Sequence, residues 1–419
     1  MFITPGSNAG RGAARTWRSR LSAWQLGWLA AAWSAASLSA EDWPHWRGPH
    51  FNGVSTETNY RVHWPAGGPK VLWRVPVGVG YSSVSVSRGR LYTMGNTKDV
   101  DAVRCVDVTS GKVLWKHAYP CVAKDPNGYH GTRATPTVDG GRVFTLSRRG
   151  HFFALDAATG RVLWAKNFPR DYGAPVPTWG FSGSPLVQGR MVITEVGGRG
   201  TSVVAFDKAT GREIWRSGSD KVAYSSIVPF VQRGQPCLAV LSADSISGRL
   251  TATGREIWRA PWKTKYDVNA ATPIVVGTRV FVSSGYGKGC ALFDFSTRPP
   301  RAVWRNKNMR NHVGTCVFWQ GHLYGFDERV LKCLEWATGR ELWKERKYGK
   351  GSLLKAGAHW IVYSDKGYVA VADLTPAGCR ELSGFQVLKG KDTWAAPVLS
   401  DGLLFCRNLD TVACVDLRP

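Results

Sequence analysis

The sequence predicts an all-β fold: a closed β-propeller of eight four-stranded antiparallel blades, with seven blades as the alternative. One phrase recurs along the chain, namely Asp, two residues, Thr or Ser, Gly, three residues and Trp. Its spacing of about 40–50 residues is that of one propeller blade. A second phrase, out of step with the first, occurs eight times. The chain also begins its repeats with a lone Trp strand and ends on an Asp-bearing strand, so its two ends can complete one blade.

The first phrase indicates a tight turn between two strands. Its Asp can accept hydrogen bonds from backbone N–H groups of the turn, and its Gly supplies a positive φ. The Trp on the following strand is large enough to fill the wedge between two neighbouring blades. The copies that follow residue 250 are degenerate, and one contains a Pro299-Pro300 insertion. We predict a structural, blade-docking role for seven tryptophans: Trp73, Trp115, Trp164, Trp215, Trp258, Trp304 and Trp343.

The second phrase is a small polar patch, often followed by Pro and an apolar strand. In a propeller the innermost strand of each blade lines the central channel, so the loops that lead into these strands gather at one mouth. Aromatic planes beside Arg, Asn and His suit a flat anionic ligand such as a quinone tricarboxylate. The alternative is that these residues close the channel mouth and contact only water. The predicted ring at the mouth contains Tyr81, Arg133, Trp179, Phe181, Tyr224, Asn269, Asn311, His312, Lys350 and Trp394.

Residues 1–40 are predicted to be a secretory signal peptide. Four arginines precede an apolar, Ala-rich stretch over 21–38, and small residues surround Ala40, where cleavage is expected. An uncleaved membrane anchor is the alternative, and no later segment is apolar enough to span a membrane. We therefore expect an exported protein, periplasmic or in the cell envelope. It would have an N-terminal extension over 41–70 that wraps the fold and a propeller over 71–419.

The chain is strongly basic, with a formal net charge of +25 that falls by four on removal of the signal peptide. Such a surplus attracts polyanions. The basic residues are scattered through every repeat and form no run, and export removes nucleic acid as a partner. Anionic lipid headgroups, cell-wall polymers, acidic polysaccharides or a merely solvated basic surface remain as interpretations.

No catalytic or metal-binding constellation can be recognised. The nine cysteines include no C-x-x-C pair. Several of them, such as Cys105 and Cys290, precede the acidic position of a repeat and are expected to be small apolar residues of inner strands. Cys406 and Cys414 could form a disulfide across a hairpin. The Gly-rich segment 284–289 is not a P-loop, and Gly180-Phe-Ser-Gly-Ser184 is not a nucleophile elbow.

The Asp-x-x-Thr-Gly-x-x-x-Trp phrase resembles the tryptophan-docking repeat of the PQQ-like β-propeller superfamily. That superfamily includes quinoprotein alcohol and glucose dehydrogenases and the non-enzymatic outer-membrane assembly factor BamB. The segment 43–55 is similar to the opening of a large group of exported bacterial PQQ-like repeat proteins. The chain departs from the enzymes because it is shorter and lacks adjacent cysteines and C-x-x-C-H. It departs from BamB because no N-terminal Cys is present for a lipid anchor.

The resemblance implies a non-enzymatic exported propeller that acts as a binding or assembly scaffold in the cell envelope. Its expected partner is an envelope protein or a cell-surface polymer, and we expect a monomer without cofactor. A PQQ-dependent dehydrogenase of reduced size, oxidising alcohols or sugars with PQQ and Ca²⁺, is the first alternative. A polyanion or glycan binder is the second.

Overall fold

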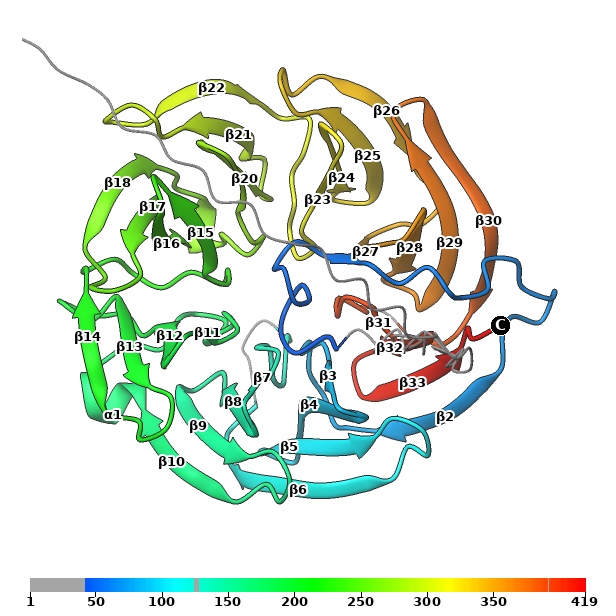
Figure 1. Cartoon of the computed structure of the whole chain (residues 1–419), viewed down its shortest axis with the longest axis horizontal. Coiled ribbons are helices and arrows are strands. Elements are labelled where there is room, and N and C mark those ends of the chain that lie inside the picture. The colour runs from blue at the N-terminus through cyan, green and yellow to red at the C-terminus, as the bar shows by residue number, and fades with distance from the viewer. Residues whose placement is uncertain (1–41, 124–127, 391) are drawn as a thin grey trace, which may run out of the picture. The chain divides into compact units, whose positions relative to one another are not determined.

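The computed structural model describes residues 42–123, 128–390 and 392–419 of the 419-residue chain. The predicted signal peptide, residues 1–40, lies outside the described residues. Residues 42–419 form eight β-sheets arranged around a central axis (Figure 1). Eight blades of antiparallel strands are therefore confirmed, and the seven-bladed alternative is wrong.

Each blade runs from a short inner strand to an outer strand at the rim. The first four blades are β3 (Ser85–Ser87), β4 (Arg90–Thr97), β5 (Val100–Asp107) and β6 (Val113–Pro120); β7 (Thr137–Asp139), β8 (Arg142–Leu146), β9 (His151–Asp156) and β10 (Val162–Asn167); β11 (Leu186–Gln188), β12 (Met191–Glu195), β13 (Val203–Asp207) and β14 (Glu213–Ser217); and β15 (Val228–Gln232), β16 (Gln235–Leu241), β17 (Ser245–Leu250) and β18 (Glu256–Pro261).

The later blades repeat this plan, and helical turns occur only in connections among the described residues. The last four blades are β19 (Ile274–Val276), β20 (Arg279–Ser284), β21 (Gly289–Asp294) and β22 (Arg301–Asn306); β23 (Val317–Trp319), β24 (His322–Asp327), β25 (Val330–Glu335) and β26 (Glu341–Glu345); β27 (Gly351–Ala356), β28 (His359–Ser364), β29 (Tyr368–Thr375) and β30 (Gly378–Gln386); and β31 (Val398–Ser400), β32 (Leu403–Arg407), β33 (Thr411–Asp416) and β2 (Val71–Pro76). The helical turns are α1 (Phe168–Tyr172) and the 3₁₀ turn η1 (Lys265–Asp267).

The ring closes as the sequence predicts. Strand β2 pairs antiparallel with β33, and Trp73 lies opposite Cys414. The indole N–H of Trp73 then donates to the carbonyl oxygen of Val108 in the first blade at 2.9 Å. The N-terminal strand of the ring thus completes the last blade as its outer strand, and the Trp73 hydrogen bond joins this blade to the first.

The joint between blades and the turn beside it explain the Asp, Gly and Trp positions of the first phrase. The indole N–H of Trp115 donates to the carbonyl oxygen of Ala157 in the next blade at 3.0 Å. A Cβ on Gly160 would lie 2.5 Å from the Trp115 ring, and Gly160 has a φ of +74°. The Asp156 carboxylate accepts hydrogen bonds from the backbone N–H groups of the turn. The same indole-on-glycine contact occurs at Trp73–Gly111, Trp164–Gly211, Trp215–Gly254 and Trp304–Gly339.

The two other predicted docking tryptophans make different joints. The turn that faces Trp258 contains the Pro299-Pro300 insertion and no Gly. Trp258 therefore stacks on Phe295 with a centroid separation of 4.8 Å, and its indole N–H donates to Gln232 Oε1. Trp343 keeps the hydrogen bond, donating to the carbonyl oxygen of Thr375 at 2.7 Å.

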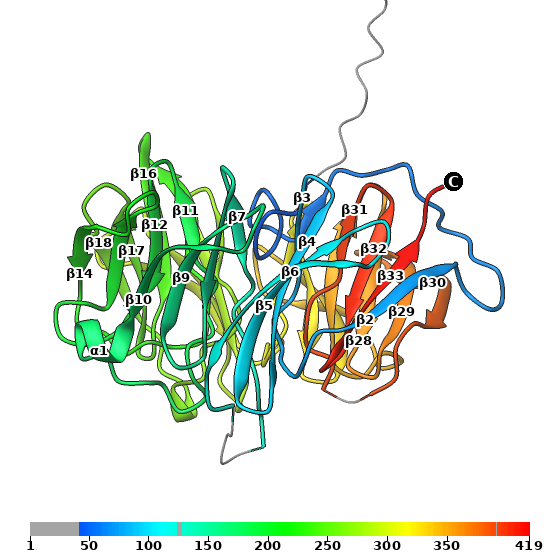
Figure 2. The same ribbon diagram turned by 90° about the horizontal axis from the view of Figure 1, so that it is seen from below.

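The first part of the N-terminal extension lies inside the ring instead of wrapping it. Residues 43–55, named here the channel plug, cross the inner strands, and Figure 1 shows them in dark blue within the ring. Trp43 exchanges backbone hydrogen bonds with Val86, and the carbonyl oxygen of Pro44 accepts from the N–H of Val138. Strand β1 (Val54–Ser55) pairs parallel with β27. Seen from the side, the channel plug lies toward one end of the channel (Figure 2).

A buried arginine holds the channel plug together. The guanidinium of Arg47 donates to the carbonyl oxygens of Phe51, Asn52 and Cys316 at 3.1, 2.7 and 2.9 Å. Burial without a carboxylate partner lowers the pKa of Arg47 to about 10. Residues beyond the plug run outward to the rim, where Trp64 packs edge-on against Phe385.

The predicted disulfide is absent. All nine cysteines carry unpaired thiols in the structure. Cys406 lies opposite Ala413, and Cys414 lies opposite Phe405, so the two are out of register across their hairpin. Burial raises the pKa of Cys414 to about 12, which leaves this thiol unreactive. Among the described residues no helix is long and apolar enough to cross a membrane.

Candidate functional site

The central channel contains a cavity of about 160 Å³ that we name the aromatic cup. Its floor is Trp46 of the channel plug, and its walls come from loops that lead into the inner strands. Both aromatic and hydroxyl side chains line it. The lining residues are Trp46, Tyr81, Tyr129, Arg133, Thr135, Trp179, Ser182, Ser184, Tyr224, Ser226, Val268, Ala270, Thr272, Tyr286, His312, Val313 and Trp394.

One wall of the aromatic cup is a stack of rings beside a cation. Tyr81 and Trp394 stack with a centroid separation of 4.7 Å, and Tyr129 lies 5.3 Å from Trp394. The guanidinium carbon of Arg133 lies 5.3 Å from the centre of the Tyr81 ring, in the range of a cation–π contact. Arg133 also donates to the carbonyl oxygen of Tyr129 at 2.6 Å. This wall presents flat apolar faces next to a permanent positive charge.

A second wall is built from rings in edge-to-face contact. Trp179 meets Tyr224 at 5.7 Å and Tyr266 at 6.3 Å. The ring centroid of Tyr286 lies 5.5 Å from that of Tyr266 and 4.9 Å from that of His312. Burial raises the pKa of Tyr224 above its ordinary value, so its phenol stays protonated near neutral pH.

Deeper in the cup, hydroxyl groups link neighbouring blades by hydrogen bonds. The Thr135 hydroxyl oxygen accepts a hydrogen bond from the backbone N–H of Ser83 at 3.1 Å. The Ser184 hydroxyl accepts from the N–H of Thr135, and the Ser226 hydroxyl accepts from the N–H of Ser184, both at 3.0 Å. Each hydroxyl occupies the same position in its own copy of the second phrase.

A fourth hydroxyl joins the floor to the walls. Thr272 Oγ1 accepts from the indole N–H of Trp46 at 2.9 Å. A Ser or Thr hydroxyl has one donor and two acceptor sites. Thr135, Ser184, Ser226 and Thr272 use their oxygens as acceptors, and within the described residues their O–H groups have no acceptor. The cup is therefore rich in hydrogen-bond donors.

The walls of the cup carry no negative charge. None of the lining residues within the described ranges is Asp or Glu. Behind His312, the Glu328 carboxylate lies 3.6 Å from the His312 ring and 3.4 Å from Lys350 Nζ. Hydrogen bonding to His312, together with the charge of Lys350, holds the pKa of Glu328 below its ordinary value. The potential in the cup thus favours neutral or anionic ligands over cations.

The structure brings together six of the ten residues of the predicted ring: Tyr81, Arg133, Trp179, Tyr224, His312 and Trp394. Phe181 lies in the core against Phe168 instead, 5.5 Å away. Asn269 is fully buried and donates to the carbonyl oxygens of Ser242, Ala243 and Trp262. Neither residue lines the cup. Asn311 is buried as well, and Lys350 contacts His312 from behind.

Backbone alternation accounts for most of this division. His312 is an exception, because it stands three residues before Thr315 and still lines the cup. Tyr81, Arg133 and Tyr224 each stand two residues before the hydroxyl position, whereas Phe181 and Asn269 stand three before it. Successive side chains of extended backbone point to opposite sides, so a shift of one residue turns a side chain from the channel to the core. Sequence reasoning missed Trp46, Tyr129, Tyr286 and the four hydroxyls. Aligning the copies on their shared hydroxyl would have identified the last group.

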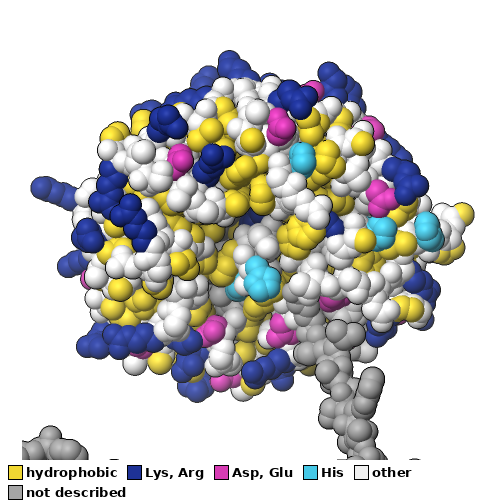
Figure 3. Space-filling model, turned by 45° about the horizontal axis from the view of Figure 1, so that its top comes forward, with side chains coloured by type: hydrophobic (Ala, Val, Ile, Leu, Met, Phe, Trp, Pro, Cys, Tyr) yellow, Lys and Arg dark blue, Asp and Glu magenta, His cyan; other side chains and the backbone are white. Residues whose placement is uncertain are grey.

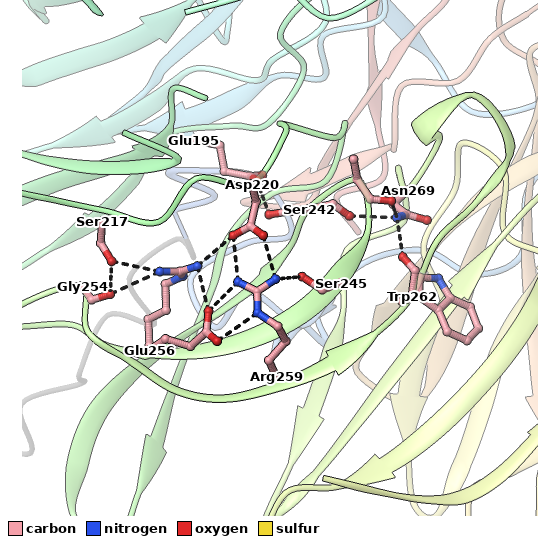
Figure 4. Close-up of polar contacts among 12 residues, drawn as sticks. Glu195, Ser217, Asp220, Ser242, Ser245, Gly254, Glu256, Arg259, Trp262 and Asn269 are labelled. Atoms are coloured by element: carbon pink, nitrogen blue, oxygen red, sulfur yellow. Dashed lines mark hydrogen bonds and ion pairs between the residues drawn. The ribbon is translucent and has the colours of Figure 1, made fainter. Parts of the chain in front are cut away.

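A second buried polar region lies between the third and fourth blades (Figure 4). Arg249, which is 1% exposed, donates to Asp220 at 3.0 Å, to Glu256 at 3.1 Å and to Ser217 at 2.9 Å. Arg259 binds the same two carboxylates at 2.7 and 2.6 Å. Each guanidinium thus meets two carboxylates, and the charges balance within the network.

Glu195 lies next to this network without a direct ion pair in the structure. Its carboxyl accepts a hydrogen bond from the Ser242 hydroxyl at 3.0 Å. Burial raises the pKa of Glu195 to about 8. No pattern in the sequence points to this group, because Glu195 ends an ordinary strand and belongs to no recognisable motif.

Residues 99–345 match a family model described as outer membrane protein assembly factor BamB, PQQ_2. The chain belongs to this family. It is 26% identical to BamB of Burkholderia pseudomallei over 57% of this chain and 58% of that protein. It is 31% identical to quinohemoprotein alcohol dehydrogenase ADH IIB of Pseudomonas putida over 33% of this chain, but spans only 18% of that enzyme. The fold matches BamB from Moraxella catarrhalis with a TM-score of 0.57 at 16% identity, covering 82% of this chain and 96% of that one.

The dehydrogenase similarity raises the question of whether the cup fits PQQ with Ca²⁺. Ca²⁺ is bound by several oxygen ligands, usually with carboxylates among them. No carboxylate lines the cup among the described residues, which also contain no group of three or more His, Cys, Asp or Glu placed to hold a metal. The donor set of the cup therefore does not fit this cofactor with its metal.

Proposed function

We propose that this protein is a non-catalytic binding scaffold of the cell envelope that holds its ligand or partner in the aromatic cup. The observation that carries this proposal is the closed, donor-rich interior of the cup. Four hydroxyls and a guanidinium stand over a Trp46 floor, with no carboxylate on the walls. Such a site can hold an oxygen-rich ligand in one orientation.

The same side chains are poorly suited to oxidation of an alcohol. Removing the hydroxyl proton requires a base within hydrogen-bond reach of the substrate. The imidazole among the lining residues is that of His312, and Lys350 Nζ lies 3.0 Å from its Nδ1. That contact occupies one of the two ring nitrogens that could act as a base. A binding function does not require a free base at this position.

Location in the envelope is supported by the family and by the chain's own N-terminus. The family description and the Burkholderia relative both name an outer-membrane assembly factor. The basic, apolar and small-residue order of 1–40 is that of a secretory signal. A rigid propeller offers broad loop faces to extended partners.

Two measurements test the proposal. The purified exported protein is incubated with PQQ and Ca²⁺, and oxidation of ethanol and glucose is followed with an artificial electron acceptor. We expect no turnover above a heat-denatured control. Reproducible turnover that Trp179→Ala abolishes would overturn the non-catalytic assignment.

The binding half is tested by photocrosslinking in producing cells. A benzophenone amino acid replaces Tyr129 at the cup mouth, or Val231, which is 66% exposed near the end of strand β15. We expect a discrete adduct with an envelope component from position 129 and none from position 231. Identical adduct patterns at the two positions would show that the cup is not the binding site.

A further inference from the structure

We infer that the aromatic cup binds the terminal sugar of an acidic oligosaccharide, a uronate-type residue with a ring carboxylate. This inference rests on the proposed binding function and names its ligand class. It combines the ring faces, the hydroxyl floor, the charge of the wall and the closed end of the channel.

The ring faces favour a flat ligand with weakly polarised C–H groups. Aromatic faces carry partial negative charge, which attracts the C–H side of a sugar ring. The same faces attract quaternary ammonium groups. Here Arg133 stands over Tyr81, and no carboxylate lines the cup among the described residues. A cationic ligand would be repelled, whereas a sugar can stack on Trp394 or Trp179 without that penalty.

The four hydroxyls deep in the cup favour an oxygen-rich ligand over an apolar peptide side chain. Thr135, Ser184, Ser226 and Thr272 are held in place by the hydrogen bonds that their oxygens accept. An apolar side chain pushed onto them would bury their O–H groups without acceptors, at a cost of about 1–3 kcal/mol for each group. Sugar hydroxyls can accept from these donors and donate to their remaining lone pairs.

The charge of the wall selects an acidic sugar. Arg133 places a guanidinium at the same wall as the Tyr81–Trp394 stack. A sugar ring stacked there would turn its carboxylate toward this guanidinium, whose planar fork matches a carboxylate. Lys350, behind His312, is paired with the Glu328 carboxylate at 3.4 Å, so Arg133 is the cation that selects the acidic sugar.

The closed floor requires that a chain end, not a chain interior, enters the cup. Trp46 is fixed by its bond to Thr272, and the channel plug fills the channel beyond it. A polymer cannot thread through. The formal net charge, which is +25 for the full chain and four lower without the predicted signal peptide, would draw an acidic polymer to the surface before its end enters. Figure 3 shows Lys and Arg side chains spread around the periphery of one face.

The test is isothermal titration of the exported protein with trigalacturonate and, as the neutral probe, maltotriose. We expect saturable binding of trigalacturonate and about tenfold weaker binding, or none, of maltotriose. Arg133→Met should weaken trigalacturonate binding about tenfold or more, since a charge-assisted hydrogen bond is lost. The matched control Arg161→Met removes the same charge from an exposed turn and should leave the affinity within about twofold, because an exposed charge is screened by salt.

A second variant guards against misfolding as an explanation. Ser226→Ala removes one hydroxyl of the floor and should weaken trigalacturonate binding severalfold, with the unfolding midpoint of each variant measured alongside. Absence of saturable binding, or equal effects of Arg133→Met and Arg161→Met, would overturn the sugar assignment. If trigalacturonate fails to bind while position 129 still crosslinks to an envelope protein, the inference falls and the proposed scaffold function stands. The occupant would then be a protein segment.

Discussion

The two ends of the central channel are both polar, but only one of them is complete. At the plug end, Arg47 is buried and its guanidinium meets three backbone carbonyls. At the cup end, the O–H groups of four hydroxyls face a cavity of about 160 Å³ and have no acceptor among the described residues. Buried donors in a finished structure nearly always have acceptors. The plug end is therefore structural, and these four O–H groups support the proposal that the cup end is a binding site.

The largest effect that separates the two ends is expected from Arg47→Met. The substitution keeps much of the side-chain volume but leaves the carbonyls of Phe51, Asn52 and Cys316 without their donor. The unsatisfied buried carbonyl of Cys316 costs about 1–3 kcal/mol and the partly buried carbonyls of Phe51 and Asn52 add less, so the loss should be about 4 kcal/mol in the free energy of unfolding. Thermal and urea unfolding measure it, with the exposed Arg161→Met as control. Equal midpoints for the two variants would mean that the channel plug is not a structural element.

The second effect concerns the Trp–Gly contacts between neighbouring blades, which hold the ring together around both ends of the channel. Gly160→Ala places a methyl group 2.5 Å from the Trp115 ring at a φ of +74°. Left-handed backbone strain and overpacking together should cost about 3 kcal/mol. Gly140 also has a positive φ, of +51°, but its Cβ would meet open space. Gly140→Ala should therefore cost only about 1 kcal/mol of strain. Comparable losses in the two variants would contradict the indole-on-glycine joint.

A third effect concerns the buried polar network between the third and fourth blades. It tests whether the carboxyl of Glu195, next to this network, is protonated in the folded protein. Glu195 is 6% exposed and has a pKa of about 8 in the folded protein. In the unfolded chain a glutamate loses its proton at a much lower pH. Between these two values the unfolded state binds fewer protons, so stability falls as pH rises and becomes constant above about pH 8.

Glu195→Gln removes this dependence, because the amide mimics the protonated acid. Relative to the variant, the parent protein should lose about 2 kcal/mol between pH 6 and pH 8. Urea unfolding of both proteins across this range measures the difference. Parallel pH profiles would show that Glu195 is ionised in the fold and that its burial is compensated by a partner.

The sequence was sufficient for features that repeat and insufficient for features that occur once. The Asp–Gly–Trp phrase predicted the blade joints because the contact between Trp and Gly recurs at five junctions, three of which also keep the Asp. It also predicted ring closure through Trp73. The channel plug was not predicted, since Arg47 and Trp46 occur in a segment without a second copy. Their roles depend on contacts with residues more than 200 positions away, such as Thr272 and Cys316.

The loops that form the candidate site were predicted correctly, but the residue of each loop that faces the cup was not always the predicted one. The second phrase correctly gathers Tyr81, Arg133 and Tyr224 at one mouth. Phe181 and Asn269 belong to the same phrase, but stand one residue earlier and therefore face the core. Composition alone cannot resolve a shift of one residue, because both sides of these loops carry polar and aromatic side chains. The hydroxyl shared by the copies supplies the register.

The smallest effect on stability is expected from Arg133→Met, the same substitution as at Arg47 but at the other end of the channel. Arg133 is half-buried, lies over the Tyr81 ring and donates to the carbonyl oxygen of Tyr129, a residue that is itself 36% exposed. Water can replace that donor, so the cost should be below about 1 kcal/mol. Thermal unfolding of the two variants side by side measures the contrast. A loss at Arg133 as large as that at Arg47 would make both ends structural, whereas unchanged stability with weakened trigalacturonate binding would assign Arg133 to the ligand and not to the fold.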